Sequence, residues 1–203
     1  MKIFKTFLSA VIVGILSLSL VACGGGNGNA IDNEPENPVT GESKILVAYF
    51  SYSGNTQTVA NMVAENTDGE LFRIVPETAY TSDDVFDRAQ SELNSGTRPS
   101  LSSHIDKDVF ASYDVIFIGF PVWWYDLPMP VWTFVEEYDF SGKTVIPFFT
   151  HNGSSSGASS LSTLERLLPD ANVKRSDALS VRGSSVSGAA NTVKNWIDKL
   201  EIK

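Results

Sequence analysis

Residues 44–50 (KILVAYF) and the hexapeptide that follows them, residues 51–56 (SYSGNT), decide the fold of this chain. The first segment is apolar after its lysine and rich in branched side chains, which is typical of a strand buried on both faces of a parallel sheet. The hexapeptide joins it to a segment in which Val59, Met62 and Val63 have helical spacing. The sequence therefore predicts a strand, a tight loop and a helix at the start of the folded domain.

The same alternation of apolar runs and helical stretches continues to the end of the chain. Further strands are expected at residues 71–75, 113–119, 145–149 and 173–181, and the last is polar enough to be an edge strand. Helices are expected at residues 55–65, 82–93, 131–138, 160–168 and 186–200. This alternation predicts an α/β fold, a doubly wound five-stranded parallel sheet with strand order 2-1-3-4-5, over residues 44–203.

Residues 1–22 have the pattern of an export signal. Lys2 and Lys5 precede an uncharged apolar stretch, as in the basic and hydrophobic regions of a secretory signal. The stretch ends in Leu20-Val21-Ala22-Cys23, a tetrapeptide that resembles the bacterial lipobox. The resemblance implies that cleavage leaves Cys23 as an acylated N-terminus, which is the lipid attachment point.

Residues 23–43 are rich in glycine, asparagine and acidic residues and contain almost nothing that could be buried, so we expect a flexible tether. Two alternatives stay open for the N-terminus: an uncleaved anchor helix, or a plain secretory signal in which Cys23 is incidental. The favoured interpretation is an extracytoplasmic, membrane-anchored lipoprotein.

Composition excludes several classes of partner. The 203 residues contain 15 Lys and Arg against 24 Asp and Glu, a formal net charge of −9. This acidity argues against nucleic-acid binding, which needs a surplus of cations. A single cysteine and two histidines exclude a disulfide framework and argue against a metal site built by the protein.

Ligands of a doubly wound sheet bind at the carboxyl ends of its strands, so the loop at residues 51–56 is a candidate site. Because this loop enters a helix, its backbone N–H groups and the helix dipole point to one spot, and Ser51, Ser53 and Thr56 add hydroxyls. The loop lacks the Gly-Lys-Ser/Thr of a P-loop and the three glycines of a dinucleotide fingerprint. The pattern predicts a phosphate site; an ordinary capped helix start is the alternative.

These residues are similar to the T-x-T-G-N-T phosphate loop of the flavodoxin family. The resemblance continues in order through Arg98-Pro99 and residues 113–119 (YDVIFIG), 121–124 (PVWW), 128–130 (PMP) and 139–144 (DFSGKT). It covers the chain from residue 44 onward and implies a flavodoxin-like domain with one noncovalently bound FMN. The residues expected to bind FMN are Ser51, Tyr52, Ser53, Gly54, Asn55, Thr56, Gln57, Thr58, Pro121, Val122, Trp123, Trp124, Tyr125, Thr150, His151, Asn152 and Gly153.

Two loops would frame the flavin ring. Either Trp123 or Trp124 is expected to stack on it, and the residues alone do not choose between them. The loop at residues 150–157 (THNGSSSG) lacks the tyrosine with which flavodoxins commonly cover the second flavin face, so one face is expected to be open. His151 and Tyr125 are the candidate proton donors if electrons move in pairs.

A serine hydrolase is one alternative function that the sequence argues against. Residues 153–157 match the G-x-S-x-G of a nucleophile elbow, but both histidines precede Ser155, which rules out the required chain order. We expect FMN-dependent electron transfer at the outer face of a membrane, with a redox partner protein or a quinone-like molecule as partner. The alternatives are an FMN-dependent two-electron reductase of quinones or similar planar acceptors, and a cofactor-free binding module of the same fold.

Overall fold

The computed structural model describes residues 43–153, 155–200 and 202. The predicted signal at residues 1–22, Cys23 and the predicted tether up to residue 42 lie outside the described residues. In the part of the chain that is described, no helix has both the length and the apolar character needed to cross a bilayer.

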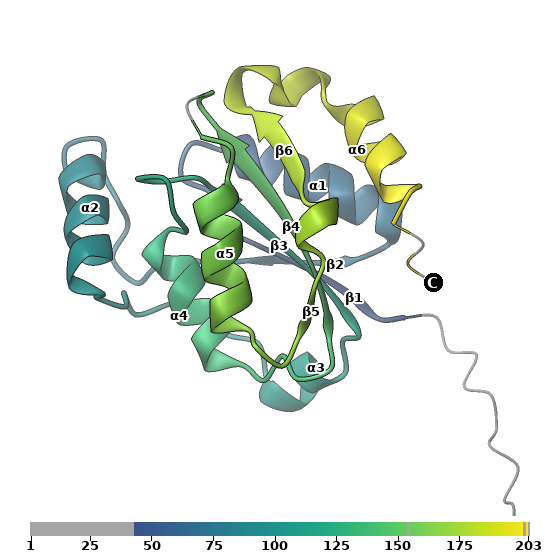
Figure 1. Cartoon of the computed structure of the whole chain (residues 1–203). Helices are drawn as coiled ribbons and strands as arrows, with labels where there is room; N and C mark the ends of the chain where they lie inside the picture. The colour runs from purple at the N-terminus through teal and green to yellow at the C-terminus, as the bar shows by residue number, and fades with distance from the viewer. Residues whose placement is uncertain (1–42, 154, 201, 203) are drawn as a thin grey trace, which may run out of the picture. The chain divides into compact units, whose positions relative to one another are not determined.

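The described domain is a sheet with helices packed on both of its faces (Figure 1). The strands are β1 (Ile45–Tyr49), β2 (Glu70–Arg73), β3 (Val115–Pro121), β4 (Thr144–His151), β5 (Asn172–Val173) and β6 (Leu179–Arg182). The α-helices are α1 (Asn55–Thr67), α2 (Val85–Ser95), α3 (Lys107–Ala111), α4 (Met129–Glu137), α5 (Ala158–Leu167) and α6 (Ala190–Ile197). Two 3₁₀ turns, η1 (Arg175–Asp177) and η2 (Gly183–Gly188), complete the chain.

The strand order is β2-β1-β3-β4-β5, with every neighbouring pair parallel, which confirms the predicted doubly wound sheet. The register places Tyr49 beside Gly119, and Pro121 beside Thr150. The carboxyl ends of β1, β3 and β4 therefore lie side by side. This is the edge at which the predicted phosphate loop and the two predicted ring loops leave the sheet.

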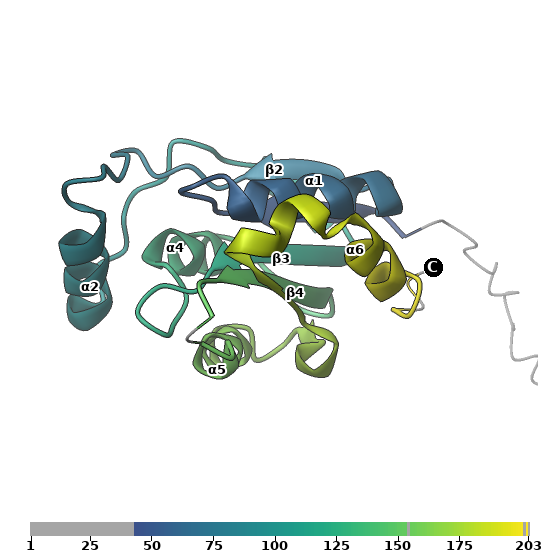
Figure 2. The same ribbon diagram turned by 90° about the horizontal axis from the view of Figure 1, so that it is seen from above.

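Alternate residues of the central strands face two hydrophobic layers, because successive side chains of a strand point to opposite faces. Leu46 and Ala48 belong to the cluster that also includes α4 and α5 residues, whereas Val47 and Tyr49 belong to the cluster that includes α1 and α6 residues. Figure 2 shows α1 and α6 on one side of the sheet and α4 and α5 on the other. Both faces are covered, as the continuously apolar strands predicted.

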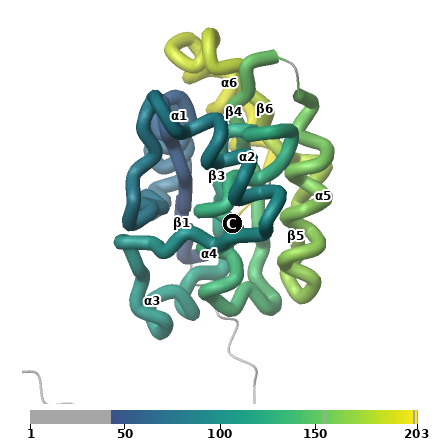
Figure 3. The backbone as a smooth tube through the Cα atoms, turned by 90° about the vertical axis from the view of Figure 1, so that its left-hand side faces the viewer, coloured from purple at the N-terminus to yellow at the C-terminus, as the bar shows by residue number. Residues whose placement is uncertain are grey.

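Helix α2 does not lie flat on the sheet. Figure 1 shows it beyond the carboxyl ends of the strands, and Figure 3, which looks onto those ends, shows it in front of them. Its buried residues are Val85, Ala89 and Glu92. This position makes α2 a wall beside the ligand-binding edge.

The prediction of one edge strand over residues 173–181 was wrong. Its place is shared by β5 and β6, which both pair with β4 in parallel. Between them, Asp177 accepts a hydrogen bond from Trp196 Nε1 at 2.5 Å, and Arg175 donates to Glu165 at 2.8 Å. These bonds to α6 and α5 draw the intervening residues out of the ladder.

Two helical predictions also need correction. The helix expected at residues 186–200 starts only at α6, because Gly188 is a poor helix former and belongs to the turn η2. Helix α3 was not predicted. Its signal is Asp106, whose carboxylate accepts hydrogen bonds from the backbone N–H groups of Asp108 and Val109 at 2.9 and 3.3 Å, as an N-cap does.

Candidate functional site

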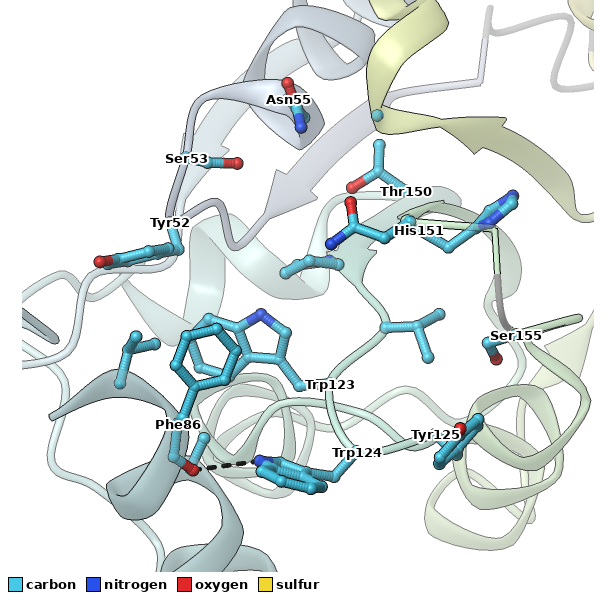
Figure 4. A pocket seen from close by; sticks show the side chains of 16 residues that line it. Tyr52, Ser53, Asn55, Phe86, Trp123, Trp124, Tyr125, Thr150, His151 and Ser155 are labelled. Atoms are coloured by element: carbon cyan, nitrogen blue, oxygen red, sulfur yellow. Dashed lines mark hydrogen bonds between the residues drawn. The ribbon is translucent and has the colours of Figure 1, made fainter. Parts of the chain in front are cut away.

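A cleft of about 410 Å³ opens at the carboxyl ends of β1, β3 and β4 (Figure 4). Its size falls in the range of small-molecule sites. Its walls come from the β1–α1 loop, α2, the β3–α4 connection, the end of β4 and the turn after β6. The lining residues are Tyr52, Ser53, Asn55, Val85, Phe86, Ala89, Pro121, Val122, Trp123, Trp124, Tyr125, Thr150, His151, Asn152, Ser155 and Gly183.

The β1–α1 loop aims the start of a helix at this cleft. Gly54, the residue before α1, has φ +90°, a left-handed conformation that glycine adopts without strain. No side chain caps the helix, so the first N–H groups of α1 are left for another acceptor. A Cβ on Gly54 would meet nothing within 4 Å, so the space above the turn is open. The arrangement suits an anion, because the helix N-terminus carries partial positive charge.

Buried hydroxyls support this loop from below. Thr56 Oγ1 and Thr150 Oγ1 lie 2.9 Å apart and share a hydrogen bond between the first turn of α1 and β4. The Ser51 hydroxyl is also buried but has no hydrogen-bond partner within the described residues. An unpaired buried hydroxyl is costly, so Ser51 is ready to bond a group that the protein itself does not supply. Arg73 Nη2 donates to the Ser51 carbonyl at 3.3 Å and holds the loop against β2.

The β3–α4 connection forms a tight turn with two aromatic residues at its tip. Trp123 N donates to Asp126 O at 3.1 Å and Asp126 N donates to Trp123 O at 2.8 Å. Trp124 and Tyr125 between them have φ +48° and +65°. Two positive φ angles are the mark of a type I′ turn, which normally uses Asn-Gly or Gly-Gly. The turn is anchored by the Asp126 carboxylate, which accepts from Leu127 N at 2.7 Å and from Thr163 Oγ1 at 3.1 Å.

The structure gives the two tryptophans different positions in the cleft, which the sequence could not do. Trp123 is half-buried and packs edge-on against Phe50 and Tyr80, with ring centroids 5.2 and 5.0 Å apart. Trp124 is 42% exposed, and its Nε1 donates to the carbonyl of Phe86 in α2 at 3.1 Å. Trp123 is thus part of the floor of the cleft, and Trp124 part of its rim.

A buried polar network holds α2 in place as a wall. Glu92 is buried and accepts hydrogen bonds from the Tyr80 hydroxyl at 2.5 Å and from Arg88 Nε at 2.7 Å. The Arg88 guanidinium also covers the Tyr80 ring, with 4.0 Å to its centroid. Burial and the hydrogen bond to Glu92 raise the pKa of Tyr80 above its ordinary value, so the phenol keeps its proton.

The end of β4 presents a polar edge. Backbone N–H of Gly153 donates to His151 Nδ1 at 2.8 Å, so the neutral imidazole carries its proton on Nε2. Gly183, after β6, lies so close to Asn55 that a Cβ on it would be 2.7 Å from Asn55 Nδ2. No charged side chain lines the cleft among the described residues. The described residues also contain no cluster of three or more metal-ligating side chains.

The structure brings together most of the residues predicted to bind the cofactor. Those that line the cleft are Tyr52, Ser53, Asn55, Pro121, Val122, Trp123, Trp124, Tyr125, Thr150, His151 and Asn152. The others, in the same loops but not lining it, are Ser51, Gly54, Thr56, Gln57, Thr58 and Gly153. The hydroxyl of Thr58 donates to Gly54 O at 3.1 Å. Its proton is therefore not available to a ligand, contrary to the expectation that Thr58 is a further donor.

Sequence reasoning missed the walls contributed by α2 and by the turn after β6. Val85, Phe86 and Ala89 carry no polar group and follow no strand, so no motif marked them. Gly183 reaches the cleft only because β6 pairs with the last residues of β4. The one signal in the sequence was Phe86 itself, a large apolar residue in a mostly polar helical stretch.

Comparison with known proteins agrees with this geometry. The chain matches the model of the flavodoxin family over residues 44–200. A crystal structure of a candidate flavoprotein from Bacteroides uniformis is 40% identical, with a TM-score of 0.69, and the match covers 78% of this chain and 100% of that one. A second candidate flavoprotein, from Bacteroides eggerthii, is 35% identical with a TM-score of 0.62, over 74% of this chain and 98% of its own.

A flavoprotein from Lactobacillus acidophilus, crystallised in complex with FMN, is 26% identical with a TM-score of 0.56, over 72% of this chain and 97% of its own. The fold and the polar loop at the start of α1 define an α/β protein with a cleft at its switch point, where the uncapped start of a helix faces the opening. The chain belongs to the flavodoxin family.

Proposed function

We propose that the domain binds one FMN in the cleft and serves as an electron-transfer flavoprotein. The observation that carries the proposal is the uncapped start of α1 at Gly54, together with the buried, unpartnered hydroxyl of Ser51. Membership of the flavodoxin family and the relative crystallised with FMN support it.

The β1–α1 loop would hold the phosphate. Its donors are the first backbone N–H groups of α1 and the side chains of Ser51, Ser53 and Asn55. The Thr56–Thr150 pair positions the loop, since its shared hydrogen bond joins α1 to β4. The helix dipole and the N–H groups supply the positive potential that lysine or arginine provides in other phosphate sites, so the absence of charged lining side chains is no obstacle.

The flavin ring would lie between the aromatic β3–α4 turn and the polar end of β4. Bound FMN supplies reversible electron transfer, and the protein supplies orientation and electrostatics. The indole of Trp123 excludes water from the floor of the cleft, because it is packed against Phe50 and Tyr80. His151 lines the opposite wall, carries its proton on Nε2 when neutral, and is a candidate donor for chemistry that consumes protons.

A binding titration of the purified full chain with FMN tests the proposal. We expect flavin fluorescence to be quenched with an end point at one FMN per chain. Ser51→Ala should weaken FMN binding by about ten- to a hundredfold, since a hydrogen bond to a charged group is worth about 1.5–3 kcal/mol. Without FMN, Ser51→Ala should leave stability unchanged or raise it, because an unpaired buried hydroxyl is removed. Ser141→Ala, an exposed serine at the other end of the sheet, is the matched control.

No uptake of FMN at micromolar concentration would refute the proposal and leave the cofactor-free binding module. Where FMN does bind, a stepwise reductive titration separates the two redox alternatives. Uptake of electrons in two resolved steps favours an electron carrier, and uptake in one two-electron step favours a reductase of planar acceptors.

We further propose that the domain is tethered to the outer face of a membrane through an acylated Cys23. The lipobox-like residues 20–23 and the composition of residues 24–43 support this placement. The wild-type chain should incorporate labelled fatty acid and lose residues 1–22, and a Cys23→Ser chain should do neither. A wild-type chain that stays in the membrane fraction without label and with residues 1–22 intact would instead support the uncleaved anchor helix.

A further inference from the structure

We propose that Asn152 is a site of spontaneous deamidation, at which His151 and Arg182 promote conversion of the side-chain carboxamide to a carboxylate. Asn152 is followed by Gly153, and the two form the one Asn-Gly pair among the described residues. A glycine after asparagine favours the reaction, because no side chain hinders the approach of the glycine nitrogen to the carboxamide. Because Asn152 lines the cleft, the product would place a negative charge beside the cofactor, and this consequence rests on the proposed function.

The reaction closes a ring between two neighbouring residues. The Gly153 backbone nitrogen attacks Asn152 Cγ, so that a new C–N bond forms and the bond from Cγ to the side-chain nitrogen breaks. The proton leaves Gly153 N, and the side-chain nitrogen gains a proton and departs as ammonia. Water then opens the cyclic imide at either carbonyl, which gives aspartate or isoaspartate. The net change consumes water and releases ammonia, with no oxidation or reduction.

His151 is placed to accept the proton that must leave Gly153. The Gly153 N–H donates to His151 Nδ1 at 2.8 Å, so the acceptor already contacts the reacting group. The neutral imidazole carries its own proton on Nε2, which leaves Nδ1 available as a general base. The imidazole lies beside the Phe149 ring, with 6.1 Å between the ring centroids, and this contact restricts its position. The imidazolium that forms returns the proton to the departing ammonia.

Arg182 brings a positive charge to the same residue. Strand β6 pairs with β4 so that Arg182 lies opposite His151. A Cβ on Gly153 would be 3.0 Å from Arg182 Cζ, so the guanidinium lies against the backbone of Gly153. Within the described residues this guanidinium has neither an ion pair nor a hydrogen bond. A cation at this place lowers the free energy of the amide anion that develops as the proton leaves.

The carboxamide of Asn152 is free to react. Its side chain is exposed and makes no hydrogen bond in the part of the chain that the structure describes. Asn66 shows the contrast, since its Nδ2 donates to Met62 O at 2.8 Å and this bond must break before the side chain can turn. A free carboxamide, an unhindered nitrogen, a base and a cation therefore meet at the end of β4.

Peptide mass mapping of the full chain, incubated at neutral pH, tests the inference with a control inside the same sample. The sequence contains a second Asn-Gly pair, Asn27-Gly28, which has no histidine next to it. We expect the acid to accumulate at Asn152. His151→Gln should slow this conversion by about tenfold or more, since a positioned general base contributes at least that much. The conversion of Asn27 should proceed at the same rate in both chains.

A second pair of variants tests the charge without removing the base. Arg182→Gln should slow the conversion of Asn152 by about two- to fivefold, as expected for one exposed charge, and Arg182→Lys, which keeps the charge, should slow it less. In urea, where the pairing of β4 with β6 is lost, all these chains should convert Asn152 at closely similar rates. Differences that persist in urea would contradict a role of the folded geometry.

The consequence for the cofactor is measured separately. Asn152→Asp copies the product, and Asn152→Gln is the neutral reference. At low ionic strength the FMN affinity of the first should be about two- to fivefold lower than that of the second, because the new carboxylate repels the phosphate while Arg182 offsets part of its charge. The difference should shrink as salt is added, which a purely steric effect would not do.

Two results would overturn the inference while the proposed function stands. They are acid that forms at Asn27 but not at Asn152, and an equal rate at Asn152 in the wild-type and His151→Gln chains. Equal FMN affinity of Asn152→Asp and Asn152→Gln at low salt would overturn the consequence for the cofactor. A wild-type chain that fails to bind FMN contradicts the proposed function and leaves the measured rates of deamidation unaffected.

Discussion

Two loops that leave neighbouring strands reach similar backbone geometry by opposite means. The β1–α1 loop takes its positive φ at a glycine, Gly54, and its hydroxyl side chains face inward or toward the start of a helix. The β3–α4 turn takes positive φ at Trp124 and Tyr125, which stand in solvent. In the first loop the local sequence prefers the observed conformation, and in the second it opposes it.

The difference shows which part of the site can be recognised from a short stretch of sequence and which part depends on contacts between distant residues. A glycine followed by a helix start can be recognised within a few residues, because the physics is local. The aromatic turn is imposed by partners far along the chain, namely Thr163, which donates to Asp126, and Phe86, which accepts from Trp124. A locally disfavoured conformation held by distant contacts is expected at a functional position.

The largest expected effect concerns the hydroxyl pair beneath the first loop. Thr56→Val or Thr150→Val alone leaves one buried hydroxyl unpaired and should lower the free energy of unfolding by about 1–3 kcal/mol. The double variant should lose less than the sum of the two, since no orphaned hydroxyl remains. Urea denaturation of the four chains measures this cycle. Strictly additive losses would contradict a shared hydrogen bond. As a control, Thr97→Val, at an exposed pair of hydroxyls, should change the free energy of unfolding by no more than about 0.5 kcal/mol.

The next effect tests whether glycine is required in the first loop. Gly54→Ala should cost about 1–2 kcal/mol, because a Cβ at positive φ is strained although the space around it is empty. Gly188→Ala is a matched control, since its Cβ would also meet nothing within 4 Å and its φ is not positive. Thermal unfolding compares the two. An equal change in both would show that backbone conformation at Gly54 is not the determinant.

A smaller effect tests the tie between the aromatic turn and α2. Trp124→Phe keeps a ring and removes the Nε1 donor to Phe86 O, which should lower the free energy of unfolding by about 0.5–1.5 kcal/mol. Amide hydrogen exchange should speed up in α2 before it does in β3 or β4. Tyr125→Phe, which removes an exposed hydroxyl, should leave that exchange unchanged. Uniform acceleration across the sheet would contradict a local tie.

The smallest expected effect is a pH dependence of stability that arises from His104. This residue lies outside both loops, and its titration should alter neither of them. The hydrogen bond and the charge of Glu137 raise the pKa of His104 above its ordinary value of 6.5. The protonated form is therefore favoured by folding, so its stabilising contribution is present below pH 6.5 and is lost as the pH rises through the raised pKa.

An NMR titration of the His104 imidazole should give the raised pKa, and His104→Gln should remove this part of the pH dependence of the melting temperature. FMN affinity should be the same in both chains, because neither His104 nor Glu137 lines the cleft. A pH dependence that grows in His104→Gln would show that the sign is wrong.

The sequence by itself determined the alternating strands and helices of the parallel sheet and the loop predicted to bind phosphate, because these depend on short-range patterns, and the commonest strand order for such a sheet is the one observed. Continuous apolar runs require burial on both faces, and a glycine between a strand and a helix leaves N–H groups free. Only the tertiary structure decided that residues 173–181 divide into β5 and β6, since the cause is hydrogen bonding to α5 and α6. The same holds for the site: Trp123 became floor, Trp124 became rim, and Phe86 joined the cleft, because each depends on contacts between segments that lie far apart in the chain.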